Sequence, residues 1–158
     1  MRKTWRLVLS AALLPGLSWS PASAQDALNP AISKLDVEVT AFLDVVASNE
    51  PRRALKQLLS GSQLSTQTEA VEQMADRAEQ LERLYGAFQE SERISRKQVG
   101  KDLVLLKYLY KCKNFPVVWY FTYYREPSSR AQMGDVNPWI VISVKFDTQF
   151  EALANGEK

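Results

Sequence analysis

Three runs late in the chain decide its fold: LVLLKYLYKC (Leu103–Cys112), VVWYFTYYR (Val117–Arg125) and WIVISVKFD (Trp139–Asp147). Each run alternates in character with a period of two, as a strand with one buried face does. Aromatic and β-branched residues favour strands, and ten of the sixteen aromatic residues lie between Tyr108 and Phe146. The polar residues 91–99 precede these runs and predict a charged edge strand. The second half of the chain is therefore predicted to form an antiparallel sheet of about four strands.

The chain ahead of these runs has helical periodicity. Residues 30–48, 51–59 and 66–86 repeat apolar side chains at steps of three and four, which predicts three helices. Thr66 and Glu69 have the spacing of a capping box at the start of the third helix. Helices followed by strands predict an α+β fold in which the N-terminal helices pack on one face of a curved antiparallel sheet.

Alternation assigns the faces of the first and third strong strands, whereas the middle strand is ambiguous and is assigned by the more apolar of its two rows. The residues expected to point toward the helices are Val104, Leu106, Tyr108, Tyr110 and Cys112, then Val117, Trp119, Phe121 and Tyr123, then Ile140, Ile142, Val144 and Phe146. Among them, five aromatic residues are candidates for lining a pocket: Tyr108, Tyr110, Trp119, Phe121 and Tyr123. These rings either fill the core, which is the commoner use of inward aromatics, or form a platform for a small apolar or sugar ligand.

The outer face of the sheet is also rich in apolar side chains. The candidates on this face are Leu105, Leu109, Tyr120, Tyr124 and Val141, interrupted by lysines such as Lys107 and Lys145. Apolar side chains on an outer face suggest that another surface covers it, which predicts a symmetric homodimer. The alternative is a scatter of surface hydrophobic residues without a partner.

The first 24 residues have the pattern of a cleavable signal peptide. A basic start, an apolar run from Leu7 to Leu14 and Ala22-Ser23-Ala24 before Gln25 predict export to the periplasm or the extracellular space. The apolar run is shorter than the roughly 20 residues that span a bilayer, so no membrane anchor is expected after cleavage. Residues 25–158 are expected to form a single domain.

Charge and composition exclude several classes of function. Without Arg2, Lys3 and Arg6 the chain has 17 basic and 18 acidic residues, which does not indicate a nucleic-acid binder. Residues 26–92 carry 12 acidic and 6 basic groups, whereas residues 93–158 carry 6 acidic and 11 basic groups. This division either steers an anion toward the sheet or, more commonly, serves solubility and partner orientation.

Catalytic and metal chemistry is restricted by the absence of histidine from the sequence. Nucleophile–histidine systems and the usual zinc sites are excluded, and no phosphate-binding loop occurs, so we assign no catalytic residue, metal or cofactor. Cys112 is the only cysteine; it is either a small buried residue or a reactive thiol beside Lys111 and Lys113. An enzyme would have to use carboxylates with tyrosines, and the acidic residues of the first helix mostly face water.

The order of these elements resembles the nuclear transport factor 2-like superfamily of α+β cones. The resemblance rests on the capped helix 66–86 and the runs LVLLKYLY (103–110), VVWYFTYY (117–124) and WIVISVKF (139–146). It implies a pocket between sheet and helices, which some members use for isomerase, dehydratase or hydrolase chemistry and others for binding without catalysis. No catalytic position of these enzymes matches this chain residue by residue. We therefore expect an exported non-catalytic binding or dimerisation domain; the alternative is a small histidine-free cavity enzyme that uses a carboxylate and a tyrosine.

Overall fold

The computed structural model describes residues 30–127 and 139–149, so the predicted signal peptide (residues 1–24) lies outside the described residues. The fold is α+β, with N-terminal helices packed on an antiparallel sheet. Its elements are α1 (Pro30–Ala47), α2 (Pro51–Leu58), η2 (Gln63–Thr66), α3 (Thr68–Glu79), α4 (Leu81–Tyr85), β1 (Phe88–Val99), β2 (Leu103–Cys112), β3 (Val117–Arg125) and β4 (Trp139–Asp147).

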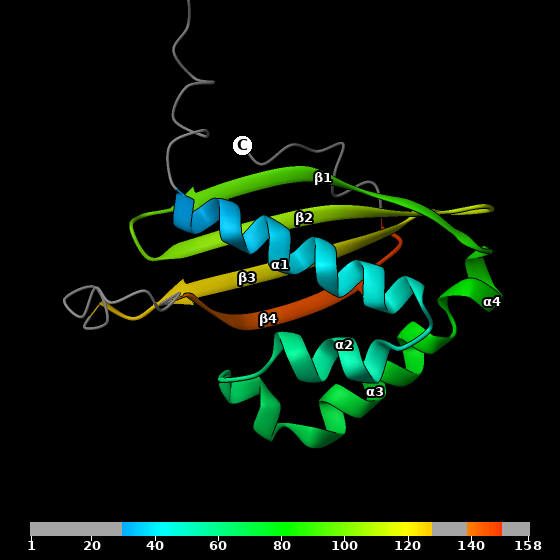
Figure 1. Cartoon of the computed structure of the whole chain (residues 1–158), viewed down its shortest axis with the longest axis horizontal. Helices are drawn as coiled ribbons and strands as arrows, with labels where there is room; N and C mark the ends of the chain where they lie inside the picture. Colours follow the sequence, from blue (N-terminus) through cyan, green and yellow to red (C-terminus); the bar gives the residue numbers. More distant parts are fainter. Residues whose placement is uncertain (1–29, 128–138, 150–158) are drawn as a thin grey trace, which may run out of the picture.

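The sheet is open and its strands follow one another in chain order. The order is β1-β2-β3-β4 and every neighbouring pair is antiparallel. Figure 1 shows α1 lying along one face of the curved sheet, with α2 and α3 beside it on the β4 side. This arrangement is consistent with a nuclear transport factor 2-like cone, as the order of the elements in the sequence suggested.

Helix α1 forms the centre of the helical layer because its apolar residues share one side. Ile32, Leu35, Val39, Phe42, Leu43 and Val46 are all buried, at the steps of three and four that the sequence predicted. The ring of Phe42 lies edge-on to Trp119 at 5.2 Å and to Phe121 at 5.5 Å, between ring centroids. The helix therefore closes directly onto the aromatic rows of the sheet.

The strands β2, β3 and β4 have the predicted bounds, whereas the third predicted helix differs from the structure. Residues 63–66 form the 3-10 helix η2, and the following residues divide into α3 and α4. The Thr66 hydroxyl donates to the carbonyl of Gln63 at 2.8 Å, and α3 begins without a side-chain cap. No capping box forms, because Thr66 completes the preceding turn instead.

The face assignment of β4 is only half correct, because the strand contains a bulge. Thr122 pairs with Ser143 and Tyr123 pairs with Val141, so Ile142 is an extra residue without a partner on β3. A bulge inverts the alternation of side chains beyond it. Val144 faces the core as predicted, whereas before the bulge Trp139 and Val141 are the buried residues and Ile140 and Ile142 are exposed.

The strand β4 is an edge strand, and the helical layer contacts it at this bulge. The hydroxyl of the buried Ser62 donates a hydrogen bond to the carbonyl of Val141. Open strand edges invite unwanted pairing, and a polar contact from a neighbouring layer reduces that hazard. Ser62 thus joins the helical layer to the sheet edge.

Candidate binding surfaces and an end cavity

The inner face of the sheet is packed by the protein's own side chains at its centre. All five predicted pocket residues belong to the hydrophobic core, and four of them, Tyr108, Trp119, Phe121 and Tyr123, lie over its centre. Trp119 also contacts Phe146, with ring centroids 4.4 Å apart. None of these four residues lines a cavity that we describe, so their rings act as core in the described part of the molecule.

Two polar atoms are buried in this aromatic layer without a hydrogen-bond partner: the Trp119 indole nitrogen and the Tyr123 hydroxyl. Burial is the main cause that raises the pKa of Tyr123 far above its ordinary value of 10.0, and the charge of Glu38 adds to it. Burial also raises the pKa of Glu38 on α1. These groups are therefore held toward their neutral forms.

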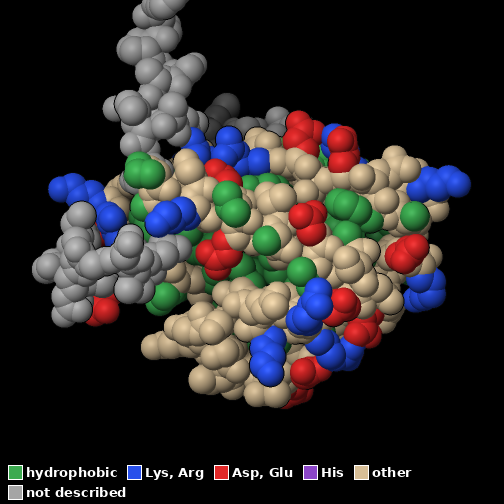
Figure 2. Space-filling view, viewed as in Figure 1, with side chains coloured by type: hydrophobic (Ala, Val, Ile, Leu, Met, Phe, Trp, Pro, Cys, Tyr) green, Lys and Arg blue, Asp and Glu red, His purple; other side chains and the backbone are tan. Residues whose placement is uncertain are grey.

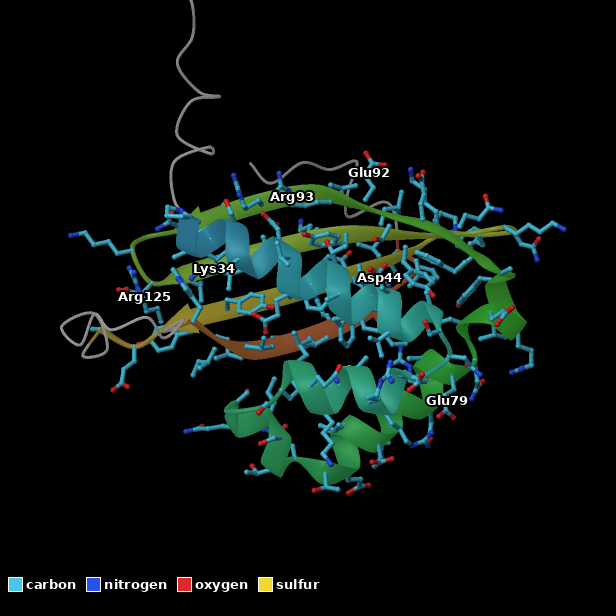
Figure 3. The ribbon with its side chains drawn as sticks, viewed as in Figure 1. Lys34, Asp44, Glu79, Glu92, Arg93 and Arg125 are labelled. Atoms are coloured by element: carbon cyan, nitrogen blue, oxygen red, sulfur yellow. The ribbon has the colours of Figure 1, made fainter. Side chains whose placement is uncertain are left out.

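A charged network closes one side of the cone between α1 and β1. The Tyr108 hydroxyl donates to Asp36 Oδ1 at 2.9 Å, while Arg93 and Arg96 donate to Asp36 Oδ2 at 2.5 and 3.2 Å. Figure 3 shows Arg93 on β1 beside α1. Asp36 was expected to face water, but its carboxylate is engaged by three donors. Such a carboxylate holds α1 on the sheet.

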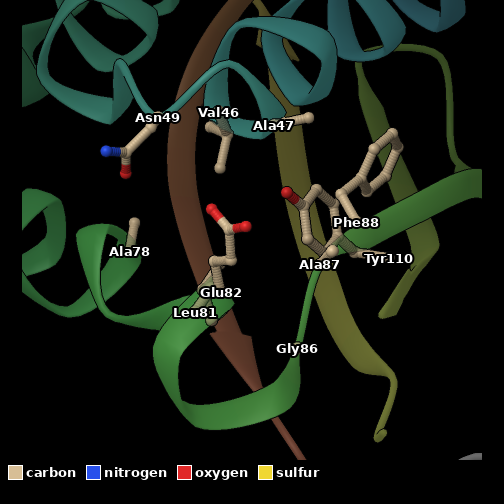
Figure 4. Close-up of a pocket in the computed structure, with 10 residues that line it drawn as sticks. All are labelled: Val46, Ala47, Asn49, Ala78, Leu81, Glu82, Gly86, Ala87, Phe88 and Tyr110. Carbon is tan, nitrogen blue, oxygen red and sulfur yellow. The ribbon is translucent and has the colours of Figure 1, made fainter. Parts of the chain in front are cut away.

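The remaining predicted pocket residue, Tyr110, lies at a cavity at the end of the molecule. This end cavity has a volume of about 200 Å³ and lies where α1 ends and β1 begins. Its lining residues, drawn in Figure 4, are Val46, Ala47, Asn49, Ala78, Leu81, Glu82, Gly86, Ala87, Phe88 and Tyr110. The carboxylate of Glu82 and the hydroxyl of Tyr110 are turned toward each other across it (Figure 4).

Local backbone geometry shapes the ends of this cavity. Asn49 has a φ of 61° and Gly86 a φ of 88°, both in the left-handed region. Asn49 ends the turn from α1 to α2, and Gly86 ends α4. At Gly86 a Cβ atom would lie 3.0 Å from the Asn114 side chain, so glycine also permits the β2–β3 connection to approach. Sequence reasoning found Tyr110 but not Glu82, because Glu82 looked like one more charge on a helix surface.

A second, apolar hollow lies between α3 and β4. It has a volume of about 160 Å³, and its lining includes Leu64, Val71, Met74 and Ile142. Ile142 is the residue that the bulge turns away from the inner face. The hollow carries no charged residue in its described lining, and its polar lining residues are Gln67 and Ser143.

The outer face of the sheet carries an apolar row at one end. The strand register places Val99, Leu103, Tyr124 and Ile140 side by side across all four strands, and we call these residues the outer row. Val99 is 45% exposed and Ile140 is 37% exposed. The outer row therefore presents apolar side chains to solvent in the described structure.

Four of the five predicted outer-face residues lie on this face, and the fifth does not. Leu105, Leu109, Tyr120 and Tyr124 lie on it and are partly exposed. Val141 is 2% exposed and points into the core, because it lies before the β4 bulge. The middle of the face is basic: Lys145 Nζ lies 4.7 Å and Lys107 Nζ 5.9 Å from the ring centroid of Tyr120.

Charged groups on the helical layer are organised around Arg52. Its guanidinium contacts Glu72, Asp76 and Glu79, so α2 is tied to the acidic side of α3. Figure 2 shows basic and acidic side chains gathered over these two helices, and Figure 3 labels Glu79 among them. These side chains are about half exposed. Exposed pairs of this kind orient surfaces more than they stabilise a fold.

Other candidate chemistry is limited in the described residues. They contain no cluster of side chains suited to a metal ion, and none of their helices is long and apolar enough to span a bilayer. Cys112 is buried, and burial, together with the charge of Glu82, raises its pKa. Its thiol is therefore held protonated, as the interpretation of a small buried residue requires.

Comparisons with protein-family models, with curated proteins and with solved structures gave no match.

Proposed function

We propose that this chain is an exported, non-catalytic binding domain that pairs with a second copy of itself through the outer face of the sheet. The observation that carries the proposal is the outer row, which crosses all four strands and is exposed at both edges. Core packing on the inner face supports it, because Phe42 occupies the space that a ligand would need over Trp119 and Phe121.

A two-fold dimer is the form of association that suits this surface. An isologous interface brings the same patch of each copy together, so an apolar row near one end of the sheet meets its equivalent. The lysines around Tyr120 lie further along the face, and a two-fold axis at the outer row keeps them away from the lysines of the other copy. The proposed contact is therefore off-centre on the sheet.

Light scattering on the mature protein tests the dimer. Tyr124→Lys places a charge in the middle of the outer row, so we expect this variant to be monomeric where the wild type is dimeric. Val37→Lys is the matched control: Val37 is apolar and 70% exposed, but it lies on α1, on the other side of the sheet. A wild-type monomer at high micromolar concentration would contradict the proposal.

The alternative, a histidine-free cavity enzyme, is favoured by one contact, the hydrogen bond from Tyr108 to Asp36 at 2.9 Å. A general base needs a free lone pair beside its substrate. Asp36 is already bonded to Arg93 and Arg96, and neither Asp36 nor Tyr108 borders a cavity that we describe. This contact therefore supports a structural role more than a catalytic one.

Export is tested separately. Expression of the full-length chain in a secreting host, followed by N-terminal sequencing of the exported product, should give a sequence that begins at or near Gln25. Recovery of the chain only inside the cell with Met1 intact would contradict this part of the proposal.

A further inference from the structure

The end cavity has the parts of a ligand site that neither the dimer nor the fold requires. It is built by residues from the C-terminal end of α1, from α3, α4 and β1, and from Tyr110 on β2. Its wall combines apolar side chains, Val46, Ala78 and Leu81 on the helical side and Phe88 on the strand side, with the polar side chains of Asn49, Glu82 and Tyr110. Helix and sheet layers thus enclose a space between them that their own side chains leave open (Figure 4).

Tyr110 and Glu82 bring to this cavity polar groups that have no partner among the described residues. Tyr110 is 3% exposed, and no hydrogen bond from the described residues reaches its hydroxyl, which lies inside the cavity. Glu82 is exposed at the mouth, and no described cation pairs with its carboxylate, unlike Glu72, Asp76 and Glu79, which share Arg52. Burial and the nearby Cys112 and Glu82 raise the pKa of Tyr110, so its hydroxyl stays neutral.

The chemistry of this pair selects a cation. A carboxylate accepts hydrogen bonds and supplies a negative charge, and a phenol oxygen accepts as well. The rings of Phe88 and Tyr110 lie 4.5 Å apart between centroids and add aromatic surface, which attracts cations. Glu82 is the one charged residue in the described lining, so the charge inside the cavity is negative. An anion would be repelled here.

We propose that the end cavity binds an alkylammonium group, with the ammonium between Glu82 and Tyr110 and the alkyl chain along Val46, Ala78 and Leu81. An ammonium has three donors and no acceptor, which matches two acceptors and leaves one donor for solvent at the mouth. A guanidinium is planar and pairs best with both oxygens of one carboxylate. Here the second acceptor is the Tyr110 hydroxyl, which lies across the cavity from Glu82. A volume of about 200 Å³ accommodates a short chain rather than a large ligand.

The test is a titration followed by amide chemical shifts, with n-butylammonium chloride as the probe and 1-butanol and sodium butyrate as neutral and anionic counterparts. We expect saturable shifts at cavity residues such as Ala47, Gly86 and Ala87 with n-butylammonium, and much smaller shifts with the other two. Equal binding of 1-butanol, or no saturable shift with n-butylammonium, would overturn the proposal.

Three variants separate the site from general charge effects. Glu82→Gln keeps the size of the side chain but removes its charge, so we expect about a tenfold loss of n-butylammonium affinity. Tyr110→Phe removes only the hydroxyl and should weaken binding by a smaller factor. Glu69→Gln is the matched control, because Glu69 is an exposed acid on α3 outside the cavity, and it should leave the affinity unchanged. Equal affinity in wild type and Glu82→Gln would contradict the assignment.

The ammonium group has two natural sources, a free amine and a lysine side chain, and a second probe distinguishes them. Nα-acetyl-lysine methylamide carries the same butylammonium end on a peptide backbone. If it binds as n-butylammonium does, the cavity accepts lysine side chains; if only n-butylammonium binds, the mouth admits free amines alone. Both results support the site, and failure of both probes overturns it, whatever the state of association of the protein.

Discussion

Phe42 projects from α1 onto the inner face of the sheet, where its ring meets Trp119 at 5.2 Å and Phe121 at 5.5 Å. Aromatic side chains bury large areas and prefer edge-to-face contacts, so this residue fills the centre of the cone efficiently. One side chain of the helical layer thus decides that the aromatic rows of the sheet serve as core.

Shortening this side chain should be costly. We predict that Phe42→Ala lowers the free energy of unfolding by about 3–5 kcal/mol, because it removes buried apolar surface and leaves a cavity. Urea unfolding of the wild type and the variant measures the difference. Val37→Ala on the same helix is the control: its side chain is 70% exposed, so the change should stay within about 0.5 kcal/mol. Similar losses in both variants would show that the ring is not buried.

Glu38 carries a cost of burial that depends on pH. Burial raises the pKa of Glu38 above its ordinary value of 4.5. The neutral carboxyl group therefore stabilises the folded state below pH 4.5, and this contribution is lost as pH rises through the folded-state pKa. We predict that Glu38→Gln stabilises the protein at pH 7, by about 0.5 kcal/mol, and has little effect below pH 4.5. Thermal or urea unfolding at both pH values measures this, and a variant less stable at pH 7 would contradict it.

At the scale of elements, the strands differ in how far the sequence could predict them. In β2 one row is more apolar, so the buried face follows from alternation, whereas in β3 the two rows are ambiguous and Val118 of the less apolar row is buried too. In β4 both rows are apolar before Ser143: Trp139 and Val141 on one, Ile140 and Ile142 on the other. Periodicity cannot choose between two such rows, and the bulge that decides the matter depends on the register with β3.

The contacts between helices and strands could not be predicted from the sequence either. The hydrogen bond from Ser62 to the carbonyl of Val141 joins positions 79 residues apart, and nothing local in either segment indicates it. The same is true of Asp36, which looked solvent-facing on α1 until Arg93 and Arg96 of β1 were placed beside it. Local sequence patterns predicted the helices and strands, whereas the partners of their polar groups could be identified only from the tertiary structure.

The contact at the β4 edge gives a prediction at this scale. Ser62→Ala leaves the buried carbonyl of Val141 without its donor, which should cost about 1–3 kcal/mol of stability. Ser33→Ala on the exposed side of α1 is a matched change and should be nearly neutral. Urea unfolding of the two variants compares them, and equal stabilities would mean that Ser62 does not hold the edge.

At the scale of the whole molecule, the layered α+β arrangement followed from the sequence, whereas the end cavity did not. Tyr110 was a candidate because it lies on the inner row of β2. Glu82 comes from a different layer and from a helix surface, where a carboxylate is ordinary. Only the packing of α4 against the start of the sheet brings the two together around one space (Figure 4).

Burial of tyrosines between the layers predicts the alkaline limit of the fold. The pKa values of Tyr108, Tyr110 and Tyr123 are all raised above 10.0, mainly by burial. Neutral phenols therefore stabilise the folded state fully below pH 10, and this stability is lost as pH rises above that value. We predict a steep fall in melting temperature above pH 10, measured by circular dichroism, with Tyr123→Phe less affected than the wild type. A melting temperature that stays constant would contradict the burial of these hydroxyls.

The central claim is that the helical layer closes onto the aromatic face of the sheet, and nuclear Overhauser effects between Phe42 and the sheet test it most directly. With ring centroids 5.2 and 5.5 Å apart, the Phe42 ring protons should show strong cross-peaks to the Trp119 indole and the Phe121 ring. Cross-peaks from Phe42 to other helical residues alone, with none to β3, would contradict the account.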